Sequence, residues 1–292
     1  MRNHFRQLPL LLALTTLLLP LGLSPVHGQE RGTTVPRVSP NAVVGQTVGV
    51  TEVKMTYGRP SVRDREIFGG LVPYGKVWRT GANETTTISF STPVRIEGEQ
   101  LDAGTYGFFT IPGPDEWTLI FNKTAEQWGA YNYNKDDDAL RVTVESESAS
   151  MQEMLTVTFR NVTDSSATGQ LHWAKTRVPF DIAVNTNDVL RSRAREAVAD
   201  MKSWKAPLPY VGYALQNEVM LDDALSWINR SIEVEKHFDN VRMKAYVLAA
   251  TGQHKQAVEV GTSALDMAES MDEAPNGVND LREKVNAWES KI

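Results

Sequence analysis

The chain has 292 residues, of which 41% are hydrophobic and 23% are charged, and its 36 acidic and 30 basic side chains give a formal net charge of −6. This acidity argues against general binding to nucleic acids or to anionic membranes. The absence of cysteine excludes disulfide bonds, zinc–thiolate sites and cysteine nucleophiles. The length suits one large domain or two ordinary ones.

Residues 1–28 have the pattern of a secretory signal peptide. Arg2 and Arg6 precede an apolar run over 8–23, and small residues stand near Gly28. A membrane anchor is the alternative, but prolines interrupt the run. We expect cleavage near Gly28, which lowers the formal charge from −6 to −8 because two arginines leave. No later run approaches the roughly 20 apolar residues that span a bilayer, so we expect an exported protein, periplasmic or extracellular, without a transmembrane span.

The segment after the predicted signal changes from polar linker to strands. Residues 29–45 are polar and contain proline, and they indicate a leader. From residue 46 to residue 185, short segments with period-two alternation and many β-branched residues follow one another, as in Thr86–Phe90. Gly- and Pro-rich turns separate them. Nine or ten such strands without helices predict an antiparallel β-sandwich or barrel-like domain, and the whole chain is expected to be α+β.

Residues 186–292 show helical periodicity instead. We expect a first helix capped by Asn187 or Asp188, then two helical hairpins with similar sequences. Ala224 and Ala257 hold equivalent places 33 residues apart, close to the 34-residue period of tetratricopeptide repeats. One interpretation is a repeat-like domain that docks a protein partner. The other is a pair of helical hairpins packed on the sheet.

The most unusual stretch is the loop between two predicted strands, residues 57–90. It combines five basic side chains, three acidic ones and several aromatic ones with five glycines. The planar guanidinium of arginine can donate two parallel hydrogen bonds to a carboxylate, sulfate or phosphate, and neighbouring aromatic rings can stack on sugars. A site for a small anionic or glycan ligand is therefore expected, and its candidate residues are Arg59, Arg65, Trp78, Arg79, Asn83 and Glu84.

Two other interpretations of this loop remain open. In the first, Arg79 pairs with Glu84, or Arg65 with Glu66, and the pairs only hold irregular backbone in place. In the second, Glu84 works with Asp64 or Glu66 as the acid/base pair of a hydrolase. Sequence spacing does not tell how far apart these carboxylates lie.

Other sites are not indicated by the sequence. Only one histidine lies in the predicted β-domain, and the chain has neither a phosphate-binding loop nor a dinucleotide-binding fingerprint. We therefore expect no metal site, no cofactor and no assigned catalytic residue.

Three long blocks resemble a known family. They are YGRPSVRDREIFGGLVPYGKVWRTGANETTTISF, LDAGTYGFFTIPGPDEWTLIFNK and WGAYNYNKDDDALRVTV. Over residues 43–184 the chain resembles the bacterial secreted domain-of-unknown-function family 2911. The resemblance implies an exported β-rich domain, often followed by helical repeats, and it implies no activity. The expected function is thus a non-catalytic envelope binding module, with a scaffold role for the helices as the alternative.

Overall fold

The computed structural model describes residues 34–292. The predicted signal peptide and residues 29–33 of the predicted leader lie outside the described residues. The β-rich part spans residues 41–184 and the helical part spans residues 186–289. Their hydrophobic clusters do not share residues, because one cluster runs from Val48 to Val184 and the two others contain only residues from Ala194 onward.

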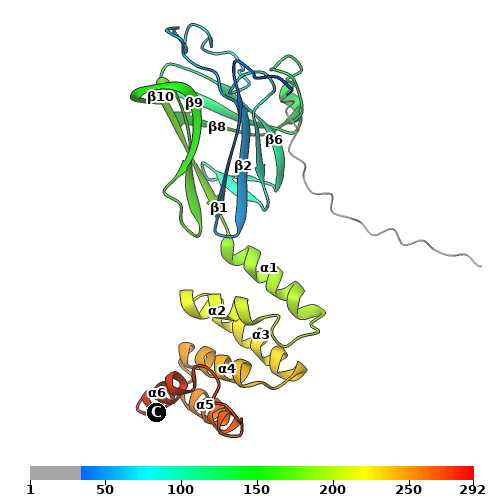
Figure 1. The fold of residues 1–292 in the computed structure, drawn as a ribbon, viewed down its shortest axis with the longest axis vertical. Coiled ribbons are helices and arrows are strands. Elements are labelled where there is room, and N and C mark those ends of the chain that lie inside the picture. Colours follow the sequence, from blue (N-terminus) through cyan, green and yellow to red (C-terminus); the bar gives the residue numbers. More distant parts are fainter. Residues whose placement is uncertain (1–33) are drawn as a thin grey trace, which may run out of the picture. The chain divides into compact units, whose positions relative to one another are not determined.

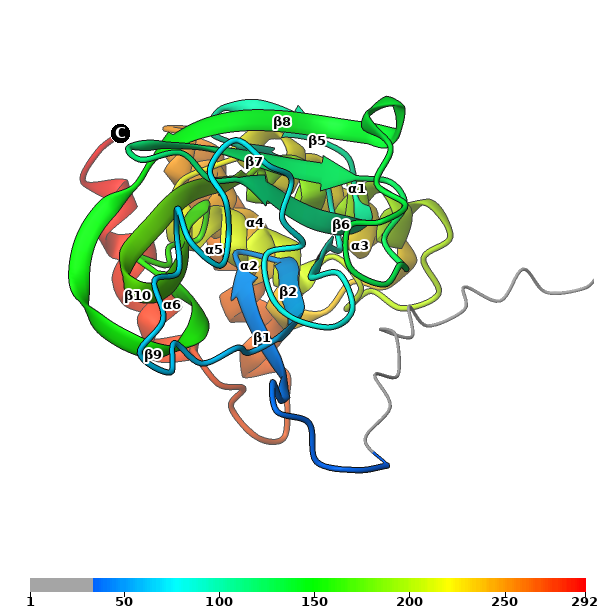
Figure 2. The same ribbon diagram turned by 90° about the horizontal axis from the view of Figure 1, so that it is seen from above.

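The β-rich part consists of two antiparallel sheets (Figures 1 and 2). The first has six strands in the order β1-β2-β3-β6-β7-β8, which are β1 (Asn41–Val48), β2 (Thr51–Gly58), β3 (Thr87–Phe90), β6 (Gly104–Ile111), β7 (Glu116–Asn122) and β8 (Asp138–Glu145). The second has four strands in the order β5-β4-β10-β9, which are β5 (Glu99–Leu101), β4 (Val94–Ile96), β10 (Ser166–Val184) and β9 (Glu147–Arg160).

The core forms between the inner faces of these sheets. In β2, Val53, Met55 and Tyr57 are buried while the residues between them are not, as period-two alternation predicts. Phe108 of β6 and Phe180 of β10 meet across the two sheets with ring centroids 5.9 Å apart. The predicted antiparallel sandwich is therefore confirmed, whereas "barrel-like" is too loose because the sheets do not close on each other.

Strand β1 begins at Asn41, inside the range 29–45 that the sequence assigned to a leader. It pairs with β2 along its whole length, from Asn41 opposite Gly58 to Val48 opposite Thr51. Only Val48 of the strand is buried. Backbone pairing with β2 therefore holds β1 in place, and an edge strand of this kind shows little hydrophobic alternation.

The long loop between β2 and β3 is anchored to both sheets. The backbone N–H of Trp78 donates to the carbonyl of Thr110 at 2.8 Å, and the N–H of Thr110 donates back at 2.9 Å. The Phe68 ring packs edge-on against Trp117 of β7 with centroids 4.8 Å apart. The N–H of Leu155 in β9 donates to the carbonyl of Pro60 at 3.0 Å. These contacts order a segment that has few ladder partners of its own.

Six helices follow the sandwich, and they are α1 (Thr186–Ala199), α2 (Leu208–Asn217), α3 (Leu221–Val234), α4 (Phe238–Ala250), α5 (His254–Glu269) and α6 (Val278–Glu289). The cap of α1 is Asn185, whose side chain accepts from the N–H of Asp188, rather than the expected Asn187 or Asp188. From α2 to α6, each helix packs on the next (Figure 1). The equivalent Ala224 and Ala257 are both fully buried in hydrophobic clusters. The helices agree with the predicted hairpins, and none of those in residues 34–292 is long and apolar enough to cross a membrane.

Candidate functional site

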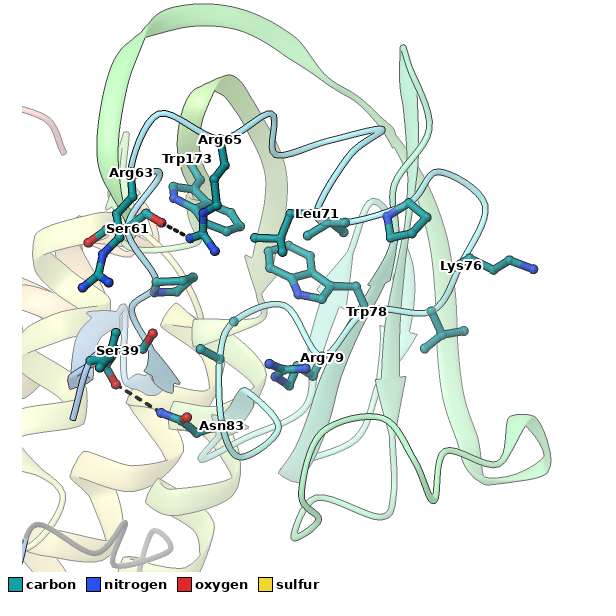
Figure 3. Close-up of a pocket in the computed structure, with 17 residues that line it drawn as sticks. Ser39, Ser61, Arg63, Arg65, Leu71, Lys76, Trp78, Arg79, Asn83 and Trp173 are labelled. Atoms are coloured by element: carbon teal, nitrogen blue, oxygen red, sulfur yellow. Dashed lines mark hydrogen bonds between the residues drawn. The ribbon is translucent and has the colours of Figure 1, made fainter.

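A cavity of about 480 Å³ lies in the long loop between β2 and β3 (Figure 3). Its walls come from most of the length of that loop, from the segment before β1 and from β10. The lining residues are Val38, Ser39, Pro60, Ser61, Arg63, Arg65, Leu71, Val72, Pro73, Lys76, Val77, Trp78, Arg79, Gly81, Ala82, Asn83 and Trp173. The volume lies within the range of small-molecule sites.

The charge of the lining has one sign. Four of the lining residues are cationic, namely Arg63, Arg65, Lys76 and Arg79, and none is an aspartate or a glutamate. In a chain with a formal charge of −6, this concentrates positive potential in one concave place. An anion entering the cavity meets arginines without displacing an acidic wall residue.

Arg79 is the least exposed of these cations. Its Nε atom is buried, and within residues 34–292 it has no hydrogen-bond partner. Burial lowers the pKa of the Arg79 guanidinium, and the nearby Tyr131 phenol partly opposes that effect. In Figure 3 the Arg79 side chain turns toward the interior of the cavity, whereas Lys76 points away from it. An unpaired and partly desolvated guanidinium favours a ligand that accepts hydrogen bonds.

The other two arginines are set by the backbone around them. The guanidinium of Arg65 donates from Nε to the carbonyl of Val62 at 2.9 Å and from Nη2 to that of Ser61 at 2.6 Å. Arg63 has a left-handed backbone with φ of 51°, and its N–H donates to the carboxylate of Glu153 at 3.1 Å. This conformation is costly for a residue with a Cβ. The loop therefore holds Arg63 in a strained conformation beside the cavity.

Two tryptophans form the apolar side of the cavity. Trp78 and Trp173 stack with ring centroids 5.8 Å apart and an interplanar angle of 16°. The indole N–H of Trp173 donates to the carbonyl of Glu153 at 3.3 Å. Both rings are largely buried, so they give the cavity a rigid floor.

The segment before β1 forms one wall, and side chains of the loop contact it. The amide of Asn83 donates to the carbonyl of Ser39 at 3.1 Å. Nη1 of Arg37 donates to both carboxylate oxygens of Glu84, at 2.8 and 2.7 Å. Glu84 is 7% exposed and does not line the cavity. Its carboxylate therefore serves to hold the residues before β1 against the loop.

Neither of the expected arginine–carboxylate pairs inside the loop is found among the described residues. Glu84 pairs with Arg37 instead of Arg79, and the Arg65 guanidinium binds backbone carbonyls instead of Glu66. The acid/base interpretation also lacks its geometry at the cavity, since neither Asp64 nor Glu66 lines it. Within residues 34–292, no cluster of three or more His, Asp or Glu side chains could hold a metal ion.

The structure brings four of the six predicted site residues together in the cavity lining: Arg65, Trp78, Arg79 and Asn83. Glu84 and Arg59 lie outside the lining. The Arg59 guanidinium donates to the carbonyl of Leu155 at 2.9 Å and to the Thr156 hydroxyl at 2.8 Å, which ties the loop to β9.

Several lining residues were not among the predicted ones. Arg63 and Lys76 belong to the basic loop, so the charge count of the loop was the signal that pointed to them. Ser39 and Trp173 enter the site from distant parts of the chain. No local pattern marks either of them.

The fold and the site define a class: an antiparallel β-sandwich whose long loop between β2 and β3 encloses a basic cavity with a tryptophan floor. Residues 39–182 match the family described as "Protein of unknown function (DUF2911)", which places the β-rich part of the chain in this family. No curated protein and no solved structure matches the chain. The family match confirms the resemblance seen in the sequence, and it carries no activity with it.

Proposed function

We propose that this protein is a non-catalytic binding module of the bacterial cell envelope that takes a small anionic or carbohydrate ligand into the basic cavity. The observation that carries the proposal is the lining, which has four cationic side chains and no carboxylate. Arg79 adds a guanidinium whose buried Nε has no partner within residues 34–292. The signal-peptide pattern of residues 1–28 supports the envelope location.

The geometry favours binding over catalysis. The buried carboxylate of the loop, Glu84, is held by Arg37 and lies outside the lining. No residue in the lining is a carboxylate or a histidine that could transfer a proton. The cavity instead offers fixed charge, a rigid floor and a volume of about 480 Å³, which are the properties of a preformed ligand site.

The experiment is a thermal-shift titration of the purified protein with succinate, phosphate and sulfate against chloride at matched ionic strength. A ligand at 100 times its Kd stabilises by about 2.7 kcal/mol, which is about 5–10 °C for a domain of this size. We expect a saturable shift with at least one anion, and its loss in Arg79→Gln. Arg160→Gln, an exposed arginine on β9, is the matched control.

General salt effects also raise melting temperatures, so the decisive quantity is the difference between the variants. An identical response of the wild type, Arg79→Gln and Arg160→Gln to every anion contradicts the proposal. A shift that disappears only in Arg79→Gln supports it.

A further inference from the structure

The exposed aromatic side chains of the described residues gather around the cavity. Three aromatic residues stand among the exposed large hydrophobic side chains of residues 34–292: Tyr74 at 43%, Trp128 at 57% and Tyr131 at 84%. Tyr74 directly follows Pro73 of the lining. Trp128 and Tyr131 belong to the turn of residues 128–132 between β7 and β8, which we call the aromatic turn. Exposed aromatic groups of this kind mark interaction sites.

The aromatic turn is fastened to the cavity wall. The N–H of Gly129 donates to the carbonyl of Asn83, a lining residue, at 3.1 Å. The N–H of Thr85 donates to the carbonyl of Gln127 at 3.0 Å, and its hydroxyl donates to the carbonyl of Gly129. An antiparallel bridge joins Glu84 and Trp128 between these bonds. The turn therefore continues the surface that the lining begins.

One exposed ring of the turn lies close to the backbone of the turn itself. Gly129 has a left-handed backbone with φ of 68°, and a Cβ there would lie 2.9 Å from a ring carbon of Tyr131. The Tyr131 side chain is 84% exposed, so the side of the ring that faces away from Gly129 is open to a ligand.

We propose that the cavity and the aromatic turn form one binding site for an acidic oligosaccharide, a proposal that rests on the anion-binding function proposed above. The carboxylate or sulfate of one sugar unit binds Arg79 in the cavity, and a neighbouring sugar ring lies on Trp128 and Tyr131. Arginine forks bind both kinds of anion. The aliphatic C–H face of a sugar matches the negative face of an aromatic ring.

The exposure of Trp128 and Tyr131, which together we call the platform, favours a sugar over a nucleotide. A sugar ring stacks with one face and keeps its hydroxyl groups hydrated, which suits rings that are 57% and 84% exposed. The acidity of the chain, with a formal charge of −6, opposes binding to the phosphate backbone of nucleic acids. The joint site therefore binds the charged group of the ligand through an arginine and a sugar ring of the same ligand through aromatic stacking.

The test is isothermal titration of the full protein with oligogalacturonate, which carries carboxylates, with sulfated dextran oligomers, with neutral dextran oligomers and with adenosine monophosphate. Three variants accompany the wild type: Trp128→Ala/Tyr131→Ala for the platform, Arg79→Gln for the cavity, and Met151→Ala as a control. Met151 is 51% exposed on β9. We expect one of the two acidic oligosaccharides to bind. Binding of oligogalacturonate would identify a carboxylate as the charged group of the ligand, and binding of sulfated dextran would identify a sulfate. The neutral oligomer should bind much more weakly.

We expect the platform variant to weaken oligosaccharide binding by about tenfold or more while the response to small anions stays intact. Arg79→Gln should weaken both, and Met151→Ala neither. An oligosaccharide affinity unchanged in the platform variant but lost in Arg79→Gln overturns the joint site and leaves the anion site standing. An unchanged affinity in Arg79→Gln contradicts the proposed function itself. Binding of adenosine monophosphate with no binding of either acidic oligosaccharide also overturns the inference.

Discussion

Replacing Arg79 by methionine should raise the stability of the protein while abolishing anion binding. The buried Nε of Arg79 has no hydrogen-bond partner within residues 34–292, and burial lowers the pKa of the guanidinium. The folded protein therefore carries a desolvation cost that the unfolded chain does not. Methionine keeps most of the apolar length of the side chain and removes the charge.

The magnitude follows from the cost of a buried donor without a partner, which is about 1–3 kcal/mol. Part of the Arg79 side chain stays in contact with solvent, so we expect the lower half of that range. At about 2–4 °C per kcal/mol, the melting temperature should rise by about 2–8 °C. Burial lowers the pKa of the Arg79 guanidinium, but an arginine side chain stays protonated in proteins. The penalty is consequently the same from pH 5 to pH 9, and only a substitution reveals it.

The assay is calorimetric and fluorescence-detected unfolding of the wild type, Arg79→Met and Arg160→Met without added anion. Arg160 is exposed on β9, and its replacement should change stability by no more than about 0.5 kcal/mol. A melting temperature of Arg79→Met several degrees below that of the wild type refutes the reasoning. It would mean that the guanidinium makes stabilising contacts and that the cavity is part of the scaffold.

Three further outcomes follow from the described contacts. Arg37→Gln should lower the free energy of unfolding by about 1–3 kcal/mol, because it removes a charged hydrogen-bond donor from the buried Glu84; an unchanged urea midpoint would contradict this. Arg63→Gly should raise the stability by up to about 1 kcal/mol, since the left-handed φ of 51° costs glycine nothing, and should weaken anion binding; a fall in both measurements would show that Arg63 is not strained. The pKa of Tyr246 is raised by burial and by its hydrogen bond to Asp280. That stabilisation is fully present below pH 10 and is lost as the pH rises above it, so urea midpoints between pH 9 and 11 should fall less in Tyr246→Phe than in the wild type.

The sequence by itself determined the elements that depend on local pattern. Alternation in β2 predicted which of its residues face the core, because successive side chains of a strand point to opposite faces. The change of period after residue 185 located the first helix, although its cap is Asn185 and not the expected Asn187 or Asp188. The density of arginines and aromatic residues between 57 and 90 marked the part of the chain that encloses the cavity.

Only the tertiary structure decided which basic and acidic side chains form ion pairs. Arg79 and Glu84 are five residues apart in the sequence, and the sequence allowed them to pair. In the fold, Arg37 approaches Glu84 across a separation of 47 residues, and Arg79 is left facing the cavity. The cause is β1, which pairs with β2 and brings the residues before it over the loop. The pairing of β1 with β2 depends on backbone hydrogen bonds, which carry no sequence signature of their own.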